Sequence, residues 1–205
     1  MSQGVGLYGG SFDPIHFGHL IGARSIAEQL GLARIFLIPS ARPPHKREHV
    51  LTEPGHRLDM ARLAVQGDPL FEVDDLELHR QGPSYTFDTV SEYRRRLGEA
   101  VELCWIIGAD SLPELPTWYR IADLVKVVRI VTTTRPGWRP PNNSLLEPTI
   151  GPESTRQLLR DCLPTPGIEI SSTDIRARVR SSRPIRYLVP ASVASHIQAH
   201  CLYRE

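Results

Sequence analysis

Two histidines, His16 and His19, stand three residues apart just after a short apolar stretch, in the segment YGGSFDPIHFGHL at residues 8–20. The glycine pair before them allows the backbone to approach a ligand closely. A helix expected to begin near Gly18 would turn the N–H groups of its first turn toward the same place. Imidazole N–H groups also donate hydrogen bonds to phosphate oxygens. The pattern therefore predicts a phosphate site at a strand-to-helix turn.

Two other interpretations of this segment are weaker. A His-x-x-His pair can bind zinc, but a zinc site needs a third or fourth ligand and only Asp13 stands nearby. Gly4, Gly6 and Gly9 spell the GxGxxG pattern of dinucleotide-binding turns. That pattern should follow a strand and open a helix, whereas here the first two glycines fall before or inside the strand.

Composition sets the broad class of the protein. The chain has 205 residues, 40% apolar and 23% charged, and a formal net charge of +1. Such a chain can bury a core, and it lacks the charge surplus that would attract nucleic acid or an anionic membrane. Its three cysteines are scattered, with no CxxC pair, which is typical of a reducing compartment. We therefore expect a cytoplasmic protein without nucleic-acid or membrane partners; a homo-oligomer stays open.

The hydrophobic pattern alternates between strands and helices. Apolar runs predict strands at Val5–Tyr8, Arg34–Pro39, Val101–Ile107 and Val127–Thr133, with a weaker one at Phe71–Asp74. Helical patterns lie between them at Leu20–Leu30, Gly55–Val65 and Thr86–Leu97, with a broken one at Trp118–Val125. This alternation predicts an α/β fold with a doubly wound, mostly parallel sheet, which binds ligands at the carboxyl ends of its strands.

The last third of the chain is expected to be mostly helical. Arg135–Thr149 is rich in proline, asparagine and glycine and predicts a surface loop. A helix near Glu153–Cys162, a short strand at Ile168–Ile170 and helices from about residue 171 onward should follow. We expect residues 1–205 to form a single domain with these C-terminal helices packed on it.

Two motifs carry a resemblance to a known family. The segment from Gly9 to His19 resembles the HxGH signature of the nucleotidyltransferase superfamily, and Ile170–Arg176, ISSTDIR, resembles its ISSTxIR element. Further elements resemble the bacterial-type nicotinate mononucleotide adenylyltransferases within that superfamily; they are Pro43–Lys46, Pro83–Thr86, Gly108–Ser111 and Leu115–Tyr119. The resemblance implies a Rossmann-like fold and transfer of AMP from ATP to nicotinate mononucleotide, giving deamido-NAD and pyrophosphate.

The resemblance also implies the residues that hold the phosphates. His16, His19 and Arg176 would be catalytic, with His45 and Lys46 adding charge from a second loop. The expected ATP-binding residues are Gly9, Gly10, Ser11, Phe12, His16, His19, Gly108, Asp110, Ser171, Ser172, Thr173 and Arg176. Mg²⁺ is expected to come with ATP, held mainly by phosphates and water and not by protein side chains.

The acceptor nucleotide would lie nearer the middle of the chain. Trp118 could stack on a pyridine ring, and the Ser84–Tyr85–Thr86 segment and Tyr119 could present backbone N–H groups to a carboxylate. Asp110 is placed to hydrogen-bond ribose hydroxyls. Two rivals remain: another adenylyl- or cytidylyltransferase, for example one acting on phosphopantetheine, and a catalytically silent nucleotide-binding regulator.

Overall fold

A computed structural model describes residues 4–41, 51–139 and 146–204. Within them lies one six-stranded sheet with the strand order β3-β2-β1-β4-β5-β6, in which every neighbouring pair is parallel. The strands are β1 Val5–Gly10, β2 Arg34–Pro39, β3 Phe71–Val73, β4 Leu103–Gly108, β5 Arg129–Thr134 and β6 Cys162–Pro164. The predicted doubly wound sheet is confirmed.

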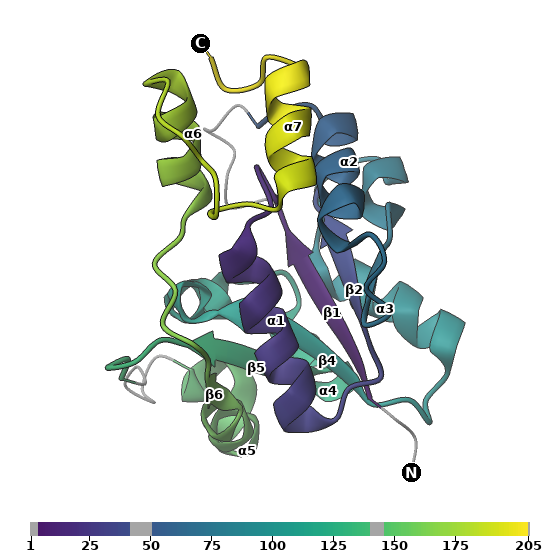
Figure 1. The fold of residues 1–205 in the computed structure, drawn as a ribbon. Coiled ribbons are helices and arrows are strands. Elements are labelled where there is room, and N and C mark those ends of the chain that lie inside the picture. The colour runs from purple at the N-terminus through teal and green to yellow at the C-terminus, as the bar shows by residue number, and fades with distance from the viewer. Residues whose placement is uncertain (1–3, 42–50, 140–145, 205) are drawn as a thin grey trace.

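Helices cover both faces of this sheet (Figure 1). Among the described residues, the α-helices are α1 Phe17–Leu30, α2 Pro54–Val65, α3 Thr86–Leu97, α4 Ile121–Val127, α5 Glu147–Arg160, α6 Ser172–Arg180 and α7 Ala191–Ala199, and the 3₁₀ helices are η2 Leu76–His79 and η3 Ala109–Thr117. No helix in the described part of the chain is long and apolar enough to cross a membrane.

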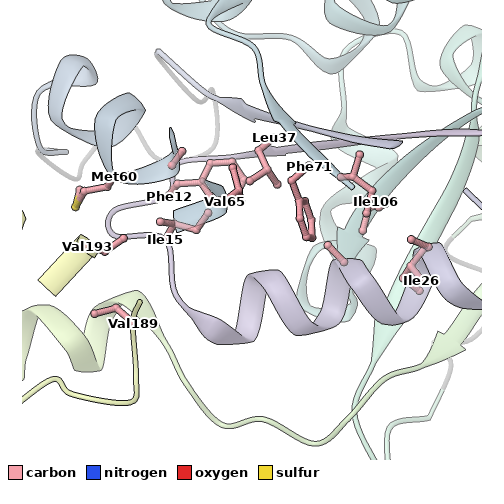
Figure 2. Packing of buried hydrophobic residues seen from close by; sticks show 14 of the residues in the cluster. Phe12, Ile15, Ile26, Leu37, Met60, Val65, Phe71, Ile106, Val189 and Val193 are labelled. Carbon is pink, nitrogen blue, oxygen red and sulfur yellow. The ribbon is translucent and has the colours of Figure 1, made fainter. Parts of the chain in front are cut away.

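The core forms two clusters, one on each face. Strand β4 is buried from Leu103 to Ile107 because both of its faces are covered, which explains its unbroken apolar sequence. Figure 2 shows the first cluster, where Phe12, Ile26 and Ile106 come from the turn after β1, from α1 and from β4. Val193 of α7 belongs to the same cluster, so the C-terminal helices pack onto the core of the sheet.

The C-terminal elements differ from the sequence-based expectation. The predicted strand at Ile168–Ile170 is wrong: the chain reaches the sheet edge earlier, and β6 pairs with β5 directly after α5 ends. The predicted helix at Glu153–Cys162 also has the wrong bounds. Helix α5 begins at Glu147 and is kinked at Gly151, where a φ of 81° precedes Pro152. The loop predicted at Arg135–Thr149 is correspondingly too long, because its last three residues belong to α5, and Gly151 and Pro152 join the two helical pieces.

Other bounds shift by a few residues. Helix α1 begins at Phe17, one turn earlier than its apolar pattern shows. The broken pattern at Trp118–Val125 covers the residue that caps the end of η3, Trp118, and most of α4, with Arg120 before α4 in a left-handed conformation at φ 54°.

Candidate functional site

Strands β1 and β4 separate at their carboxyl ends. Their pairing stops at Leu7 opposite Trp105, while β1 continues beside β2 to Gly10 and β4 continues beside β5 to Gly108. The chain crosses from one half of the sheet to the other at this point, and doubly wound sheets bind ligands at such switch points. A cleft of about 630 Å³ opens there.

This cleft brings together most of the predicted site residues. They are Gly9, Gly10, Ser11, Phe12, His16, His19, Ser84, Tyr85, Thr86, Gly108, Asp110, Trp118, Tyr119, Ser171, Ser172 and Thr173. His45 and Lys46 lie outside the described residues. The two signature motifs, more than 150 residues apart in the sequence, thus face one cavity.

The two histidines are stacked on each other. Their ring centroids lie 3.7 Å apart and their planes differ by 26°. The backbone N–H of His16 donates to Nδ1 of His19 at 3.2 Å. Because Nδ1 accepts, the proton of a neutral His19 lies on Nε2, which makes Nε2 a donor. The His19 ring also packs edge-on against Phe12, with 5.3 Å between centroids.

His16 is held neutral by its surroundings. Its side chain is 5% exposed. Burial, with a smaller contribution from the positive charge of Arg135, lowers the pKa of His16 from 6.5 to about 4. The stacked pair therefore avoids two adjacent cations near pH 7, and His16 approaches a ligand as a neutral imidazole.

The start of α6 lines the opposite side of the cleft. Ser171 caps this helix, since its Oγ accepts the backbone N–H of Asp174 at 3.1 Å. Ser172 Oγ donates to the carbonyl of Pro14 at 2.9 Å, which joins the second motif to the first. The N–H groups of the first helical turn, next to the capped end, are a ready site for an anion.

Arg176, in contrast, does not line the cleft formed by the described residues. Its Nη1 donates to the carbonyl of Asp13 at 2.7 Å, and its Nη2 donates to Oγ1 of Thr173 at 3.3 Å. In this structure the guanidinium therefore holds the backbone of the turn between β1 and α1.

Asp13 fixes the same turn through its side chain. The residue is 2% exposed. Its Oδ1 accepts the hydroxyl of Tyr203 at 2.7 Å and its Oδ2 accepts the backbone N–H of Thr52 at 3.2 Å. Burial and the neighbouring carboxylate raise the pKa of Tyr203, so its hydroxyl stays a donor. Tyr203, near the C-terminus, thus anchors the turn between β1 and α1.

Arg57 of α2 binds this turn from the interior of the protein. Its guanidinium is fully buried at 0% exposure. Nη1 donates to the carbonyls of Ser11 at 2.7 Å and Ser40 at 2.8 Å, and Nε donates to that of Thr52 at 2.8 Å. Burial lowers the pKa of Arg57, and the negative charge of Asp13 opposes that shift.

An aromatic wall forms the other end of the cleft. The rings of Tyr85 and Tyr119 lie 4.5 Å apart at 31°, and Trp118 lines the cleft beside them. Tyr119 is 48% exposed, so this wall is open to solvent. Flat, partly exposed rings of this kind suit an aromatic ligand.

A buried network supports this wall. Thr89 Oγ1 donates to Oε1 of Glu77 at 2.7 Å and accepts from Arg80 at 2.9 Å. Ser84 also hydrogen-bonds Glu77, whose pKa is raised by burial. These contacts fix the segment that leads into α3.

Packing alone requires a glycine at position 9. A Cβ at this position would lie 2.6 Å from two ring atoms of Trp105. Any side chain at position 9 would collide with this indole, which lies directly against the backbone of β1.

Known proteins match this chain over almost its whole length. Residues 7–178 match the family described as Cytidylyltransferase-like. A protein of Moorella thermoacetica named "Probable nicotinate-nucleotide adenylyltransferase" is 40% identical over 98% of this chain and 91% of its own length. The Bacillus subtilis protein named nicotinate-nucleotide adenylyltransferase is 38% identical over 97% of each chain. This chain belongs to the nicotinate-nucleotide adenylyltransferase family.

Solved structures show the same fold. The nicotinic acid mononucleotide adenylyltransferase of Plasmodium falciparum, solved in complex with NaAD, matches 98% of this chain and 97% of its own with a TM-score of 0.76 at 19% identity. The predicted nucleotidyltransferase fold is therefore confirmed, and it is shared even at this low sequence identity.

Three residues of this adenylyltransferase fold were missed in the sequence. Arg135 lines the cleft directly after β5, although it was assigned to a surface loop. Its position at the carboxyl end of a parallel strand could have indicated it. Glu77 and Arg57 gave no such signal, because a single charged residue in a helix usually faces solvent.

Substituting Arg57 tests its hold on the turn. Arg57→Lys should lower the free energy of unfolding by about 2–4 kcal/mol, because the single nitrogen of lysine cannot reach all three carbonyls that the guanidinium binds and leaves some of them buried without a partner. Urea unfolding measures the change. Arg62→Lys on the same helix, exposed and paired with Asp75, is the matched control and should change stability by less than about 0.5 kcal/mol. Equal losses in the two variants would contradict this role.

The His16 ring should titrate far below an ordinary histidine. NMR of the imidazole nitrogens in the free protein should give a pKa near 4, well below the usual 6.5. Since the unfolded chain takes up this proton near pH 6.5, the burial of His16 also makes the protein lose stability as the pH falls from about 6.5 to about 4. Titration of His16 near 6.5 would show that the ring is solvated.

Proposed function

We propose that this chain transfers AMP from ATP to the phosphate of nicotinate mononucleotide, releasing pyrophosphate and forming deamido-NAD. The observation that carries this proposal is the pairing, within one cleft, of the phosphate-binding turn at His16 and His19 with the aromatic wall at Trp118 and Tyr119. The names of the full-length relatives support the same reaction. As ATP is the substrate, we place the protein in the cytoplasm.

The reaction needs positioning more than acid–base chemistry. An oxygen of the acceptor phosphate attacks the α-phosphorus of ATP in line with the bond to the β-phosphate. That bond breaks, and pyrophosphate leaves with the bonding electron pair. The attacking phosphate is ionised near neutral pH, so no protein base has to remove a proton. Alignment and stabilisation of the charge on the α-phosphate and the leaving group provide the rate.

The charge would be stabilised by groups on two sides of the cleft. Nε2–H of His19 and the ring of His16 would donate to phosphate oxygens from α1. The amides of Ser172 and Thr173 would donate from the start of α6, and Arg135 would add a positive charge between them. Donors aimed at developing charge each contribute a factor of about 10²–10³.

Arg176 would act through position. Because its guanidinium bonds the carbonyl of Asp13, it fixes the turn that carries His16 and His19. We therefore assign it as a positioning residue with a positive charge near the phosphates.

Mg²⁺ would enter bound to ATP. The phosphate side of the cleft offers imidazole nitrogens and hydroxyls, whereas Mg²⁺ prefers oxygen ligands and keeps several waters. Asp110 provides an exposed carboxylate at the end of β4. The ion would add charge neutralisation on the phosphate oxygens, and Asp110 remains our candidate for the ribose hydroxyls.

The nicotinate ring would lie against Trp118, with Tyr85 and Tyr119 at its edge. Its carboxylate would meet the first turn of α3, which begins at Thr86 and presents backbone N–H groups. An anionic carboxylate gains more from this helix end than a neutral amide does. The arrangement therefore favours the acid form of the nucleotide.

Parallel assays of pyrophosphate release test the function. The protein is given ATP and Mg²⁺ with nicotinate mononucleotide, nicotinamide mononucleotide or phosphopantetheine. Fast release with the nicotinate form alone supports the proposal. Release only with phosphopantetheine would overturn the assignment of the aromatic wall, and silence with all three would favour a nucleotide-binding regulator.

His19→Ala should affect turnover far more than folding. Loss of the Nε2 donor is expected to lower kcat by about 10²-fold or more, while the melting temperature falls by only a few degrees. The exposed His79, replaced in His79→Ala, is the matched control and should leave kcat unchanged. A His19→Ala enzyme with nearly full turnover would remove His19 from the mechanism.

Trp118→Ala should weaken binding of the acceptor nucleotide and leave binding of ATP almost unchanged. Loss of ring stacking is expected to raise KM for nicotinate mononucleotide about 3- to 10-fold, with KM for ATP little changed. Steady-state kinetics with each substrate varied in turn measures both constants. Equal increases in the two would tell against stacking.

A further inference from the structure

Three histidines gather outside the cleft, on the surface where α2 meets α7. His56 stands in the first turn of α2, and His196 and His200 lie four residues apart at the end of α7. One ring nitrogen from each falls within 4.8 Å of the other two. None of the three lines the cleft formed by the described residues, so the adenylyl transfer proposed above leaves them unused.

The two helices that carry these rings form a fixed frame. They pack side by side (Figure 1), and Met60 of α2 and Val193 and Ile197 of α7 share one buried cluster. Ser192 Oγ also donates to the carbonyl of Leu63 at 3.0 Å. Ligands carried by packed helices are held more precisely than ligands on loops.

The spacing of the ring nitrogens matches a metal site. His56 Nδ1 and His196 Nε2 lie 3.2 Å apart. With zinc–nitrogen bonds of about 2.0–2.1 Å, two ligands of a tetrahedral ion stand about 3.3 Å apart. The third ring, on His200, is exposed at the helix end, and one of its nitrogens lies within 4.8 Å of those of the other two rings. Two histidines at i and i+4 on one helix face are an established way to hold zinc.

The chemistry of the cluster selects the ion. We propose that His56, His196 and His200 bind a divalent transition-metal ion, with Zn²⁺ as the best match. Imidazole nitrogens suit zinc and its neighbours and suit Mg²⁺ poorly, so the Mg²⁺ that accompanies ATP would not compete. Asp59, exposed and close enough to act on His196 electrostatically, adds a negative charge beside the cluster. Water would fill the remaining coordination position.

Such an ion would fasten α2 to α7. Helix α2 carries Arg57, which holds the carbonyl of Ser11, and the chain beyond α7 carries Tyr203, which holds Asp13. A bound ion would therefore stabilise the two supports of the nucleotide-binding turn without entering the cleft.

Calorimetric titration tests the proposal on the full chain. The protein is first stripped with a chelator, and ZnCl₂ is then added without nucleotide, in excess Mg²⁺. One Zn²⁺ per chain is expected. His196→Asn and His200→Asn should each raise Kd at least about 10-fold. With free Zn²⁺ at about 100 times Kd, the melting temperature of the wild type should rise by about 5–10 °C, and that of His196→Asn much less.

Three variants locate the ion. His79→Asn removes an exposed histidine elsewhere, Cys201→Ser removes the exposed thiol next to His200, and His19→Asn breaks the stacked pair in the cleft. All three should bind Zn²⁺ like the wild type. Binding lost in His19→Asn or Cys201→Ser, or retained in both His196→Asn and His200→Asn, would overturn the proposal. If His196→Asn folds poorly, Zn²⁺ binding by His200→Asn, at the helix end, is the deciding measurement.

Discussion

The structure depends on how the turn between β1 and α1 is held. Its backbone carbonyls face into the protein and are bound by three donors from two distant helices: Arg57 of α2, and Ser172 and Arg176 of α6. Tyr203, near the end of the chain, binds the Asp13 side chain. Buried carbonyls without donors would cost about 1–3 kcal/mol each, so these contacts decide whether the turn keeps one conformation.

That constraint explains why the site is assembled from both ends of the chain. The stacked histidines follow the turn directly, and the capped start of α6 reaches the same cleft through its bond to Pro14. Strands β1 and β4 open the space between them by separating after Leu7 and Trp105. The aromatic wall, at the end of η3 and the start of α3, completes the cavity. In the proposed reaction one end of the cleft would receive phosphates and the other a ring.

Local patterns predict the sheet and the motifs but not their supports. The strands can be predicted from the sequence because both of their faces are buried, which makes them apolar throughout. The turn between β1 and α1 can also be predicted, because its glycines and histidines are close together in the sequence. Arg57 and Tyr203 act on partners 46 and 190 residues away, and nothing beside them in the sequence reveals a buried carbonyl or carboxylate. The prediction of a strand at Ile168–Ile170 was wrong for a related reason. The position at which the chain meets the sheet depends on the length of α5 and not on local propensity.

A crystal structure of this protein with deamido-NAD bound would test the account most directly. We expect the pyrophosphate bridge between the His16–His19 pair and the start of α6, with the nicotinate ring against Trp118 and the ribose near Asp110. A dinucleotide bound in the reverse direction, or with its phosphates away from both histidines, would contradict the account.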